Sequence, residues 1–322
     1  MLIESLEANR SIRFRCPAKL NLWLDTLGKR PDGYHEISTV MCPIDLWDEL
    51  TVTVRDDELT RLTIHFPYQS DRDPISDPAW KVPADASNLV CKAVSLASKS
   101  IGKEAQGYDI QLVKRIPSSA GLGGGSSNAA AAVVSVLAVW GKWDLCLAGG
   151  ICQKIGSDVN FFLGTSDGIG MGHATGRGEV VRLLKSKPAI QFWLTHPPKG
   201  CSTRDVYAKV DRIGDLSKTE DFLATCQTGQ ESKIGAAMFN ALQLPASEIN
   251  GWIHMQLELL AECGCKHLLM SGSGSSCFGI IPAEGSFELL RVRASEVGVN
   301  RVYQVSAWYG PSIERQLALH CR

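Results

Sequence analysis

The sequence has no apolar run long enough to cross a membrane. Its longest run, residues 129–140, falls well short of the roughly 20 residues that a membrane-spanning helix needs. The N-terminal segment MLIESLEANRSIRFRC also lacks the apolar centre of a signal peptide, and its composition is not that of a transit peptide. We therefore expect a cytoplasmic protein with no membrane partner.

The chain also lacks an excess of charge, a cysteine framework and a metal-binding pattern. Its 33 basic and 34 acidic residues leave a formal net charge of −1, so we expect no nucleic-acid partner. This does not exclude a nucleotide substrate, because a phosphate site needs only local donors. The eleven cysteines contain no CxxC pair, which predicts reduced thiols. The seven histidines show no HExxH spacing, so we predict no structural metal site.

What the chain does have is the length and apolar content for two domains. It has 322 residues, of which 44% are hydrophobic and 21% charged, as in ordinary globular proteins. Alternating apolar residues predict strands at 12–15, 20–24 and 50–54. Strands and helices then mix without regular βα alternation, which favours an α+β fold. We place the domain boundary near residues 186–188, so that domain 1–186 precedes domain 187–322.

Several further elements are expected from turn and capping residues. Ser87 is a candidate N-cap for a helix that ends near Ser100, and residues 68–85 have the Pro, Asp and Ser content of a surface loop. In the second half, two strands are expected around the segment SGSGSS between residues 266 and 281. That half is also expected to hold a strand at 189–195, helices around 203–210, 222, 234–242, 247–263 and 287–297, and a strand at 302–308. In the first half, a turn is expected at 28–33, a helix at 126–140, and turns in the glycine-dense segment 165–178.

The most informative segment is a glycine-rich loop between a predicted strand and a predicted helix, Pro117-Ser-Ser-Ala-Gly-Leu-Gly-Gly-Gly-Ser-Ser127. Glycines let several backbone N–H groups approach one anion, and the start of a helix adds free N–H groups and its dipole. Ser126 and Ser127 are able to bind phosphate oxygens or Mg²⁺. The loop is not a Walker A motif, because no Gly-Lys-Ser/Thr closes it. The alternative is a glycine connector beside a tightly packed alanine helix.

At this loop the chain resembles the GHMP kinases, which include galacto-, homoserine, mevalonate and phosphomevalonate kinases. The family's first motif appears as Cys16-Pro-Ala-Lys-Leu-Asn-Leu22, and its third as Ser271-Gly-Ser-Gly-Ser-Ser-Cys-Phe278. The resemblance covers nearly the whole chain. It implies a two-domain fold, with an N-terminal domain like ribosomal protein S5 domain 2 and a ferredoxin-like C-terminal domain. The active site is then expected in the cleft between them.

The resemblance also implies ATP as cosubstrate, with Mg²⁺. A second phosphate-facing loop is implied at Ser271, Gly272, Ser273 and Gly274, although this composition also suits a plain turn. The ATP-binding residues implied are Pro117, Ser118, Ser119, Ala120, Gly121, Leu122, Gly123, Gly124, Gly125, Ser126 and Ser127, with Asn88 and Leu89 near adenine. Asn88 and Leu89 have an ordinary alternative as the first residues of a helix.

Two residues are implied to do the chemistry. Asp158, in the segment Ile-Gly-Ser-Asp-Val, matches the family's catalytic aspartate, which accepts the proton of the acceptor hydroxyl. Lys19 matches the cation that orients Asp158 and stabilises developing charge. Asn21 lies two residues on and therefore on the same face of the strand, where it is expected to bind the substrate. The family usually has Pro where this chain has Asn160.

The segment Gly-Lys-Arg-Pro-Asp-Gly-Tyr-His-Glu at residues 28–36 narrows the substrate. It is typical of family members that phosphorylate the 2-hydroxyl of a cytidine-diphosphate-linked methylerythritol in the non-mevalonate isoprenoid pathway. The resemblance then implies that Tyr34 stacks on cytosine, that His35 reads its hydrogen-bonding edge, and that Thr203 contacts the substrate. Tyr207 would supply the second wall around cytosine, with ordinary helix packing as its alternative.

Two other functions stay open at this point. One is another small-molecule kinase of the same family, of the homoserine or mevalonate type. The other is a non-catalytic nucleotide-binding regulator on the same fold, which the retention of Lys19 and Asp158 argues against. The sequence predicts no oligomeric state.

Overall fold

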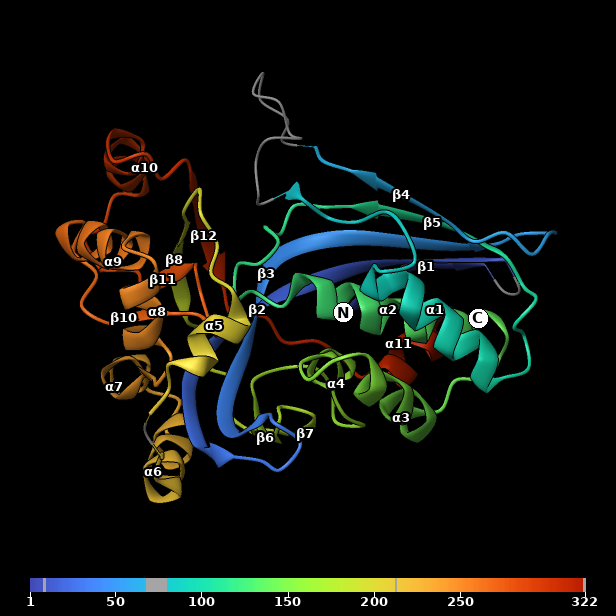
Figure 1. Ribbon diagram of the computed structural model, residues 1–322, viewed down its shortest axis with the longest axis horizontal. Coiled ribbons are helices and arrows are strands. Elements are labelled where there is room, and N and C mark those ends of the chain that lie inside the picture. The colour runs from blue at the N-terminus through green and yellow to red at the C-terminus, as the bar shows by residue number, and fades with distance from the viewer. Residues whose placement is uncertain (8–9, 68–79, 212, 321–322) are drawn as a thin grey trace.

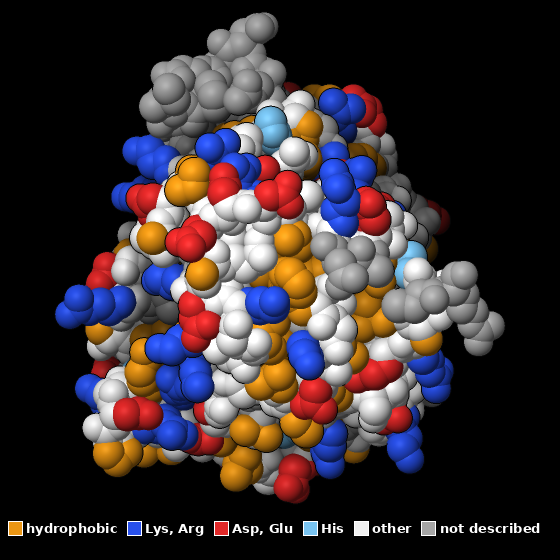
Figure 2. Space-filling model, turned by 90° about the vertical axis from the view of Figure 1, so that its right-hand side faces the viewer, with side chains coloured by type: hydrophobic (Ala, Val, Ile, Leu, Met, Phe, Trp, Pro, Cys, Tyr) orange, Lys and Arg blue, Asp and Glu red, His pale blue; other side chains and the backbone are white. Residues whose placement is uncertain are grey.

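The computed structural model describes residues 1–322 except 8–9, 68–79, 212 and 321–322 (Figure 1). The surface loop expected at 68–85 therefore lies mostly outside the described residues. Strands and helices mix without regular alternation, which confirms the α+β prediction. No helix in the described part of the chain is both long and apolar enough to span a bilayer. On the face shown in Figure 2, basic and acidic side chains are interspersed, as the net charge of −1 suggests.

An eight-stranded sheet forms the larger part of the molecule. Its main path runs in the order β1 (Leu2–Glu7), β2 (Ser11–Lys29), β3 (His35–Val54), β5 (Tyr108–Val113) and β4 (Arg61–His65). All neighbours on this path are antiparallel except β4 and β5, which are parallel. Beside it, β6 (Gly172–Gly176) pairs with β3 and with β7 (Val180–Leu183), and β9 (Phe239–Asn240) pairs in parallel with β2.

The strands expected at 12–15 and 20–24 are parts of one strand, β2. Pro17 lies between them, but the β2–β3 pairing shifts register between Pro17 and Ala18 and then continues. A proline is tolerated in a strand at such an irregularity because no regular ladder hydrogen bond is needed from it there. The turn expected at residues 28–33 is confirmed, since it lies at the junction of β2 and β3.

Helices cover one face of this sheet (Figure 1). They are α1 (Leu89–Ser100), α2 (Gly124–Val139), α3 (Leu145–Ile155), α4 (Val159–Leu163) and α11 (Ile313–His320). The central helix α2 is buried on nearly all sides, which explains its run of alanine and valine. The N-cap of α1 is Asn88 rather than Ser87. The Asn88 side chain accepts a hydrogen bond from Val90 N, whereas the Ser87 hydroxyl is bonded to Asp85.

A four-stranded antiparallel sheet forms the smaller part. Its strand order is β10 (Leu268–Met270), β11 (Cys277–Ile280), β8 (Gln191–His196) and β12 (Arg301–Ser306). The β10–β11 pair around SGSGSS is as predicted. The helices of this part are α5 (Thr203–Ala208), α6 (Leu216–Gln227), α7 (Glu231–Ala237), α8 (Gln243–Ile249), α9 (Trp252–Glu262) and α10 (Phe287–Glu296).

Two of the expected helices are wrong in extent. The helix expected at 234–242 ends at Ala237, because the chain then extends to form β9 against β2. The helix expected at 247–263 is two helices, α8 and α9, divided at Asn250. That side chain accepts a hydrogen bond from Trp252 N at the start of α9 and donates one to Lys199 O, so it ties the break to the chain segment before α5.

Both ends of the chain lie on the larger part. Neither β1 nor α11 was expected, and they hold each other through Gln316, which accepts a hydrogen bond from Ile3 N and donates one to Met1 O. Ile313 and Leu317 of α11 join the core beneath the large sheet. The division into 1–186 and 187–322 stays a prediction, to which the structure adds that the last helix packs on the N-terminal core.

Candidate active site

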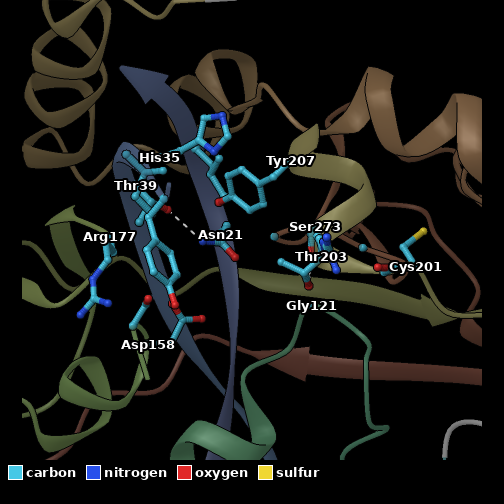
Figure 3. Close-up of a pocket in the computed structure, with 18 of the residues that line it drawn as sticks. Asn21, His35, Thr39, Gly121, Asp158, Arg177, Cys201, Thr203, Tyr207 and Ser273 are labelled. Atoms are coloured by element: carbon cyan, nitrogen blue, oxygen red, sulfur yellow. Dashed lines mark hydrogen bonds between the residues drawn. The ribbon is translucent and has the colours of Figure 1, made fainter. Parts of the chain in front are cut away.

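A cavity of about 970 Å³ opens between the two parts of the molecule and is lined by residues of both (Figure 3). It brings together many of the residues predicted from sequence, namely Lys19, Asn21, Tyr34, His35, Ser119, Gly121, Gly123, Asp158, Thr203, Tyr207, Gly272, Ser273 and Gly274. The other predicted residues do not line it. These are Asn88, Leu89, Pro117, Ser118, Ala120, Leu122, Gly124, Gly125, Ser126, Ser127 and Ser271.

The predicted catalytic pair is in place. Lys19 on β2 is only 3% exposed, and its Nζ lies 3.5 Å from Oδ2 of Asp158, whose side chain is 31% exposed. The same ammonium donates to Gly121 O at 2.8 Å and to Asn21 Oδ1. Burial lowers the pKa of Lys19, and the neighbouring Asp158 opposes part of that shift. A cation and a carboxylate thus meet at the cavity wall, with one edge of the carboxylate open.

Asn21 lies on the same face of β2 as Lys19, as the alternation predicts. Its Nδ2 donates to Thr39 Oγ1 at 2.8 Å, which fixes the amide with its oxygen toward Lys19 (Figure 3). Thr39 also lines the cavity and was not found from the sequence. Its position depends on the β2–β3 register, which shifts between Asn21 and Trp23, so no sequence pattern indicates it.

The glycine loop and the SGSGSS loop are in direct contact. Gly121 has φ +74°, and a Cβ there would lie 2.0 Å from Ser271 O. The Ser271 hydroxyl donates to Gly121 O at 2.9 Å, and Ser276 N donates to Ala120 O at 3.2 Å. Glycine is therefore required at position 121 both by backbone conformation and by the close approach of the second loop.

The helix α2 begins at Gly124, two residues before the start that we expected. Its N-cap is Gly123, with φ +69°, and no side chain among the described residues caps it. The first N–H groups of α2 are thus free for a ligand. Leu89 lies at the start of α1, and its Cδ1 would be 3.6 Å from a Cβ on Gly125. The predicted Asn88–Leu89 segment therefore lies next to the glycine loop, outside the cavity.

A buried ion pair lies beneath this loop and was missed by sequence reasoning. Asp48 on β3 is 0% exposed and accepts hydrogen bonds from Lys114 Nζ at 2.7 Å and Asn128 Nδ2 at 2.9 Å. It also accepts from the backbone N–H groups of Arg115 and Ile116, at 2.7 and 2.8 Å. One carboxylate thereby ties β3 to the chain segments on both sides of the glycine loop.

Two of the predicted cytosine-binding residues, His35 and Tyr207, form a ring pair in the cavity. The rings of His35 and Tyr207 have centroids 5.1 Å apart, with Tyr207 carried by α5. Burial and the charge of Lys29 lower the pKa of His35, which favours a neutral imidazole. Thr203 Oγ1 lies 2.8 Å from Ser273 Oγ, so α5 and the SGSGSS loop are in contact. The pairing of these rings could not be read from residues so far apart in sequence.

Tyr34 is not part of that ring pair. Its side chain is 55% exposed, and the guanidinium of Arg177 lies over its ring, 5.0 Å from the centroid. Arg177 lines the cavity and belongs to the glycine-dense segment 165–178, in which only turns were expected. This segment includes β6 as well.

Asn160, which stands where the family usually has Pro, leaves helix α4 intact. Helix α4 begins directly after Asp158, and Asn160 Nδ2 donates to Glu179 O at 3.0 Å. Asn160 thus ties the start of α4 to the β6–β7 turn through a contact that Pro is unable to make.

Comparison with known proteins gives the family. Models of the GHMP kinases N terminal domain and of the GHMP kinases C terminal match residues 88–166 and 222–300. A 4-diphosphocytidyl-2-C-methyl-D-erythritol kinase of Rhodopirellula baltica is 34% identical, covering 82% of this chain and 85% of its own length. A protein of the same name from Protochlamydia amoebophila is 35% identical, covering 88% of this chain and 90% of its own length. The chain belongs to the GHMP kinase family.

Solved structures of GHMP kinases agree. A crystal structure of 4-(cytidine 5'-diphospho)-2C-methyl-D-erythritol kinase has a TM-score of 0.67 at 29% identity, covering 92% of this chain and 99% of that one. A homoserine kinase from Cytophaga hutchinsonii has a TM-score of 0.68 at 17% identity, covering 97% and 98%. At that identity the second likeness shows the fold alone. The predicted family and fold class are thus confirmed.

Proposed function

We propose that this GHMP kinase transfers the γ-phosphate of ATP to the 2-hydroxyl of 4-diphosphocytidyl-2-C-methyl-D-erythritol. One observation carries the proposal: a single cavity is lined by the Lys19–Asp158 pair and by the His35–Tyr207 ring pair. A cytidine-linked alcohol needs both, because its base requires aromatic contacts and its hydroxyl requires a carboxylate and a cation. The names of the relatives, all of this one kinase, support the same substrate.

In the proposed reaction the substrate hydroxyl oxygen bonds to the γ-phosphorus, and the bond from that phosphorus to the β–γ bridging oxygen breaks to release ADP. Asp158 accepts the hydroxyl proton, since its carboxylate is open to the cavity. Lys19 orients Asp158 and stabilises the charge that develops on the transferred group. Asn21 positions the acceptor, because Thr39 and Lys19 fix its amide.

We propose that ATP binds with its phosphates on the glycine loop, at the uncapped start of α2. Mg²⁺, when bound, neutralises charge on the β- and γ-phosphates. Ser126 and Ser127 are the residues that would hold it, together with phosphate oxygens. The Ser127 hydroxyl is buried and has no partner among the described residues, which fits a role in ligand binding. No acidic cluster able to cage a metal occurs in the described chain, which suits an ion held mainly by phosphates.

With this substrate, we propose that the enzyme acts in the non-mevalonate isoprenoid pathway and in the cytoplasm. The ten cysteines among the described residues are free thiols, most of them buried, which fits a reducing compartment.

An acceptor comparison tests the function. Purified protein with ATP and Mg²⁺ is given the cytidine substrate, homoserine or mevalonate, and ADP release is measured. We expect turnover of the cytidine substrate alone. Turnover of homoserine or mevalonate without the cytidine substrate would assign the chain to another kinase of the family. ATP binding without turnover of any acceptor would indicate a nucleotide-binding regulator.

A further inference from the structure

Arg177 is a cavity residue that the proposed mechanism does not use. It lies in the turn between β6 and β7, and its side chain lines the cavity near Asp158 (Figure 3). The next residue, Gly178, packs against the catalytic carboxylate, since a Cβ there would lie 3.4 Å from Asp158 Oδ1. The cavity that contains Asp158 therefore holds the positive charge of Arg177 in addition to that of Lys19.

The guanidinium is held in a way that leaves its donors available. It lies over the Tyr34 ring, which is a cation–π contact, and its Nε is 3.7 Å from Glu179 Oε1. That distance is too long for a hydrogen bond. The other Glu179 oxygen accepts from the backbone N of Arg177 at 2.6 Å, so this carboxylate is partly used by the main chain. Among the described residues, no hydrogen bond uses the terminal amino groups of Arg177.

The proposed substrate carries a diphosphate between its cytidine and its alcohol. With cytidine at the His35–Tyr207 rings and the alcohol at Asp158, the diphosphate has to lie along the cavity wall between them. Lys19 is already engaged by Asp158, Asn21 and Gly121. The remaining cavity cations, Lys29 and Arg204, are exposed, whereas Arg177 is partly buried.

We propose that Arg177 binds the diphosphate of the substrate and that the Tyr34 ring holds its guanidinium in position. The proposal rests on the proposed function, because it takes the diphosphate from that substrate. A planar guanidinium pairs with two phosphate oxygens at once, and the partly buried site strengthens the pairing. Arg177 thus determines specificity for a cytidine diphosphate over cytidine itself.

Binding of a ligand series without ATP tests this directly. Isothermal titration calorimetry measures cytidine, CMP and CDP binding to the wild type and to Arg177→Gln, Arg177→Lys and Arg182→Gln. The control residue, Arg182, is an exposed arginine on β7 outside the cavity, so its loss removes the same charge from the same hairpin. Thermal unfolding of each variant verifies folding.

We expect Arg177→Gln to weaken CDP binding by about 10- to 100-fold and to change cytidine binding by less than about twofold. Arg177→Lys is expected to fall between, because an ammonium keeps the charge and loses the paired geometry. Arg182→Gln is expected to bind all three ligands as the wild type does. In turnover, Arg177→Gln should raise KM for the cytidine substrate and leave KM for ATP unchanged.

Two results with Arg177→Gln would overturn this inference and leave the proposed function intact. One is wild-type CDP affinity in Arg177→Gln, and the other is an equal loss of CDP and cytidine affinity, which would indicate a structural role. If Arg177→Gln does not fold, wild-type CDP affinity in Arg177→Ala would count against the inference in the same way. A wild type that binds CDP no better than cytidine would overturn the inference, and a wild type that does not turn over the cytidine substrate would overturn the proposed function itself.

Discussion

Two lysine–aspartate pairs in this molecule share a buried lysine and differ in the aspartate. In the pair beneath the glycine loop, Lys114 Nζ lies 2.7 Å from Asp48, which is completely buried. In the pair at the cavity, Lys19 Nζ lies 3.5 Å from Asp158, which keeps an exposed edge. The hydrogen bonds of Asp48 are all made within the protein, whereas Asp158 keeps an exposed edge that a substrate is able to contact.

The difference shows how one pair of residue types serves two purposes. Asp48 accepts four hydrogen bonds from two chain segments, so its charge is compensated where it lies. Such a carboxylate holds the structure together and is not available to a substrate. Asp158 stands at the first turn of α4 with fewer restraints, which suits a group that must meet an incoming hydroxyl. The predictions below test this contrast.

The largest effect is expected from Asp158→Asn. The amide is unable to accept the hydroxyl proton, so kcat should fall by about 10³- to 10⁴-fold, equivalent to about 4–5.5 kcal/mol. Stability should fall by less than in Asp48→Asn, because the Asp158 side chain is 31% exposed and solvent therefore compensates part of the charge of the buried Lys19. Single-turnover phosphate transfer and thermal unfolding measure the two quantities. A wild-type rate would remove Asp158 as the base.

The opposite result is expected for Asp48→Asn. It leaves the Lys114 ammonium buried beside a neutral group, which should lower the free energy of unfolding by about 3–5 kcal/mol. Urea denaturation at constant pH measures it. The double variant Asp48→Asn with Lys114→Met should be more stable than the single one, because it removes the uncompensated charge. A loss of less than about 1 kcal/mol would mean that the two pairs do not differ in their structural role.

The pair at the cavity, Lys19–Asp158 (the open pair), was predictable from the sequence. The pair beneath the glycine loop, Lys114–Asp48 (the closed pair), was not. Lys19 and Asp158 lie in motifs of the GHMP kinase family. The glycine loop is recognisable because four glycines between a strand and a helix cost conformational entropy unless the backbone there has a role. Asp48, Lys114 and Asn128 are single polar residues without a motif. Only the β3–β5 pairing and the packing of α2 bring them together. Burial of this kind is a property of the tertiary fold.

The prediction of the fold from sequence has the same limit, because long-range pairing is not visible in local sequence patterns. Alternation and capping residues predicted most strands and helices, but the single strand β2 and the short strand β9 depend on long-range pairing. The helix α11 was missed because it forms by packing on β1 at the other end of the chain. Arg177 and Thr39 reach the cavity by the same kind of long-range pairing, from β6–β7 and β3.

A smaller effect is expected from Gly121→Ala. This change should displace the Lys19–Asp158 pair and leave the Lys114–Asp48 pair in place. Gly121 has φ +74° and touches Ser271 O, and its own carbonyl accepts from Lys19. An alanine should displace the loop, cost about 1–3 kcal/mol of stability and raise KM for ATP about tenfold. Gly102→Ala is the control, with φ +68° but open space around it. Equal effects of the two on KM would show that the contact between the loops is unimportant for ATP.

The smallest effect concerns the dependence of activity on pH. Burial lowers the pKa of Lys19, so its ammonium loses the proton at a lower pH than the ordinary lysine value of about 10.4. As pH rises through that lowered pKa, the charge that orients Asp158 disappears, and kcat/KM should fall by up to tenfold per pH unit. In Lys19→Arg the guanidinium stays charged, so whatever activity remains should persist to higher pH. If kcat/KM falls over the same alkaline pH range in the wild type and in Lys19→Arg, the titrating group is not Lys19. The pH dependence would then give no information about the Lys19–Asp158 pair.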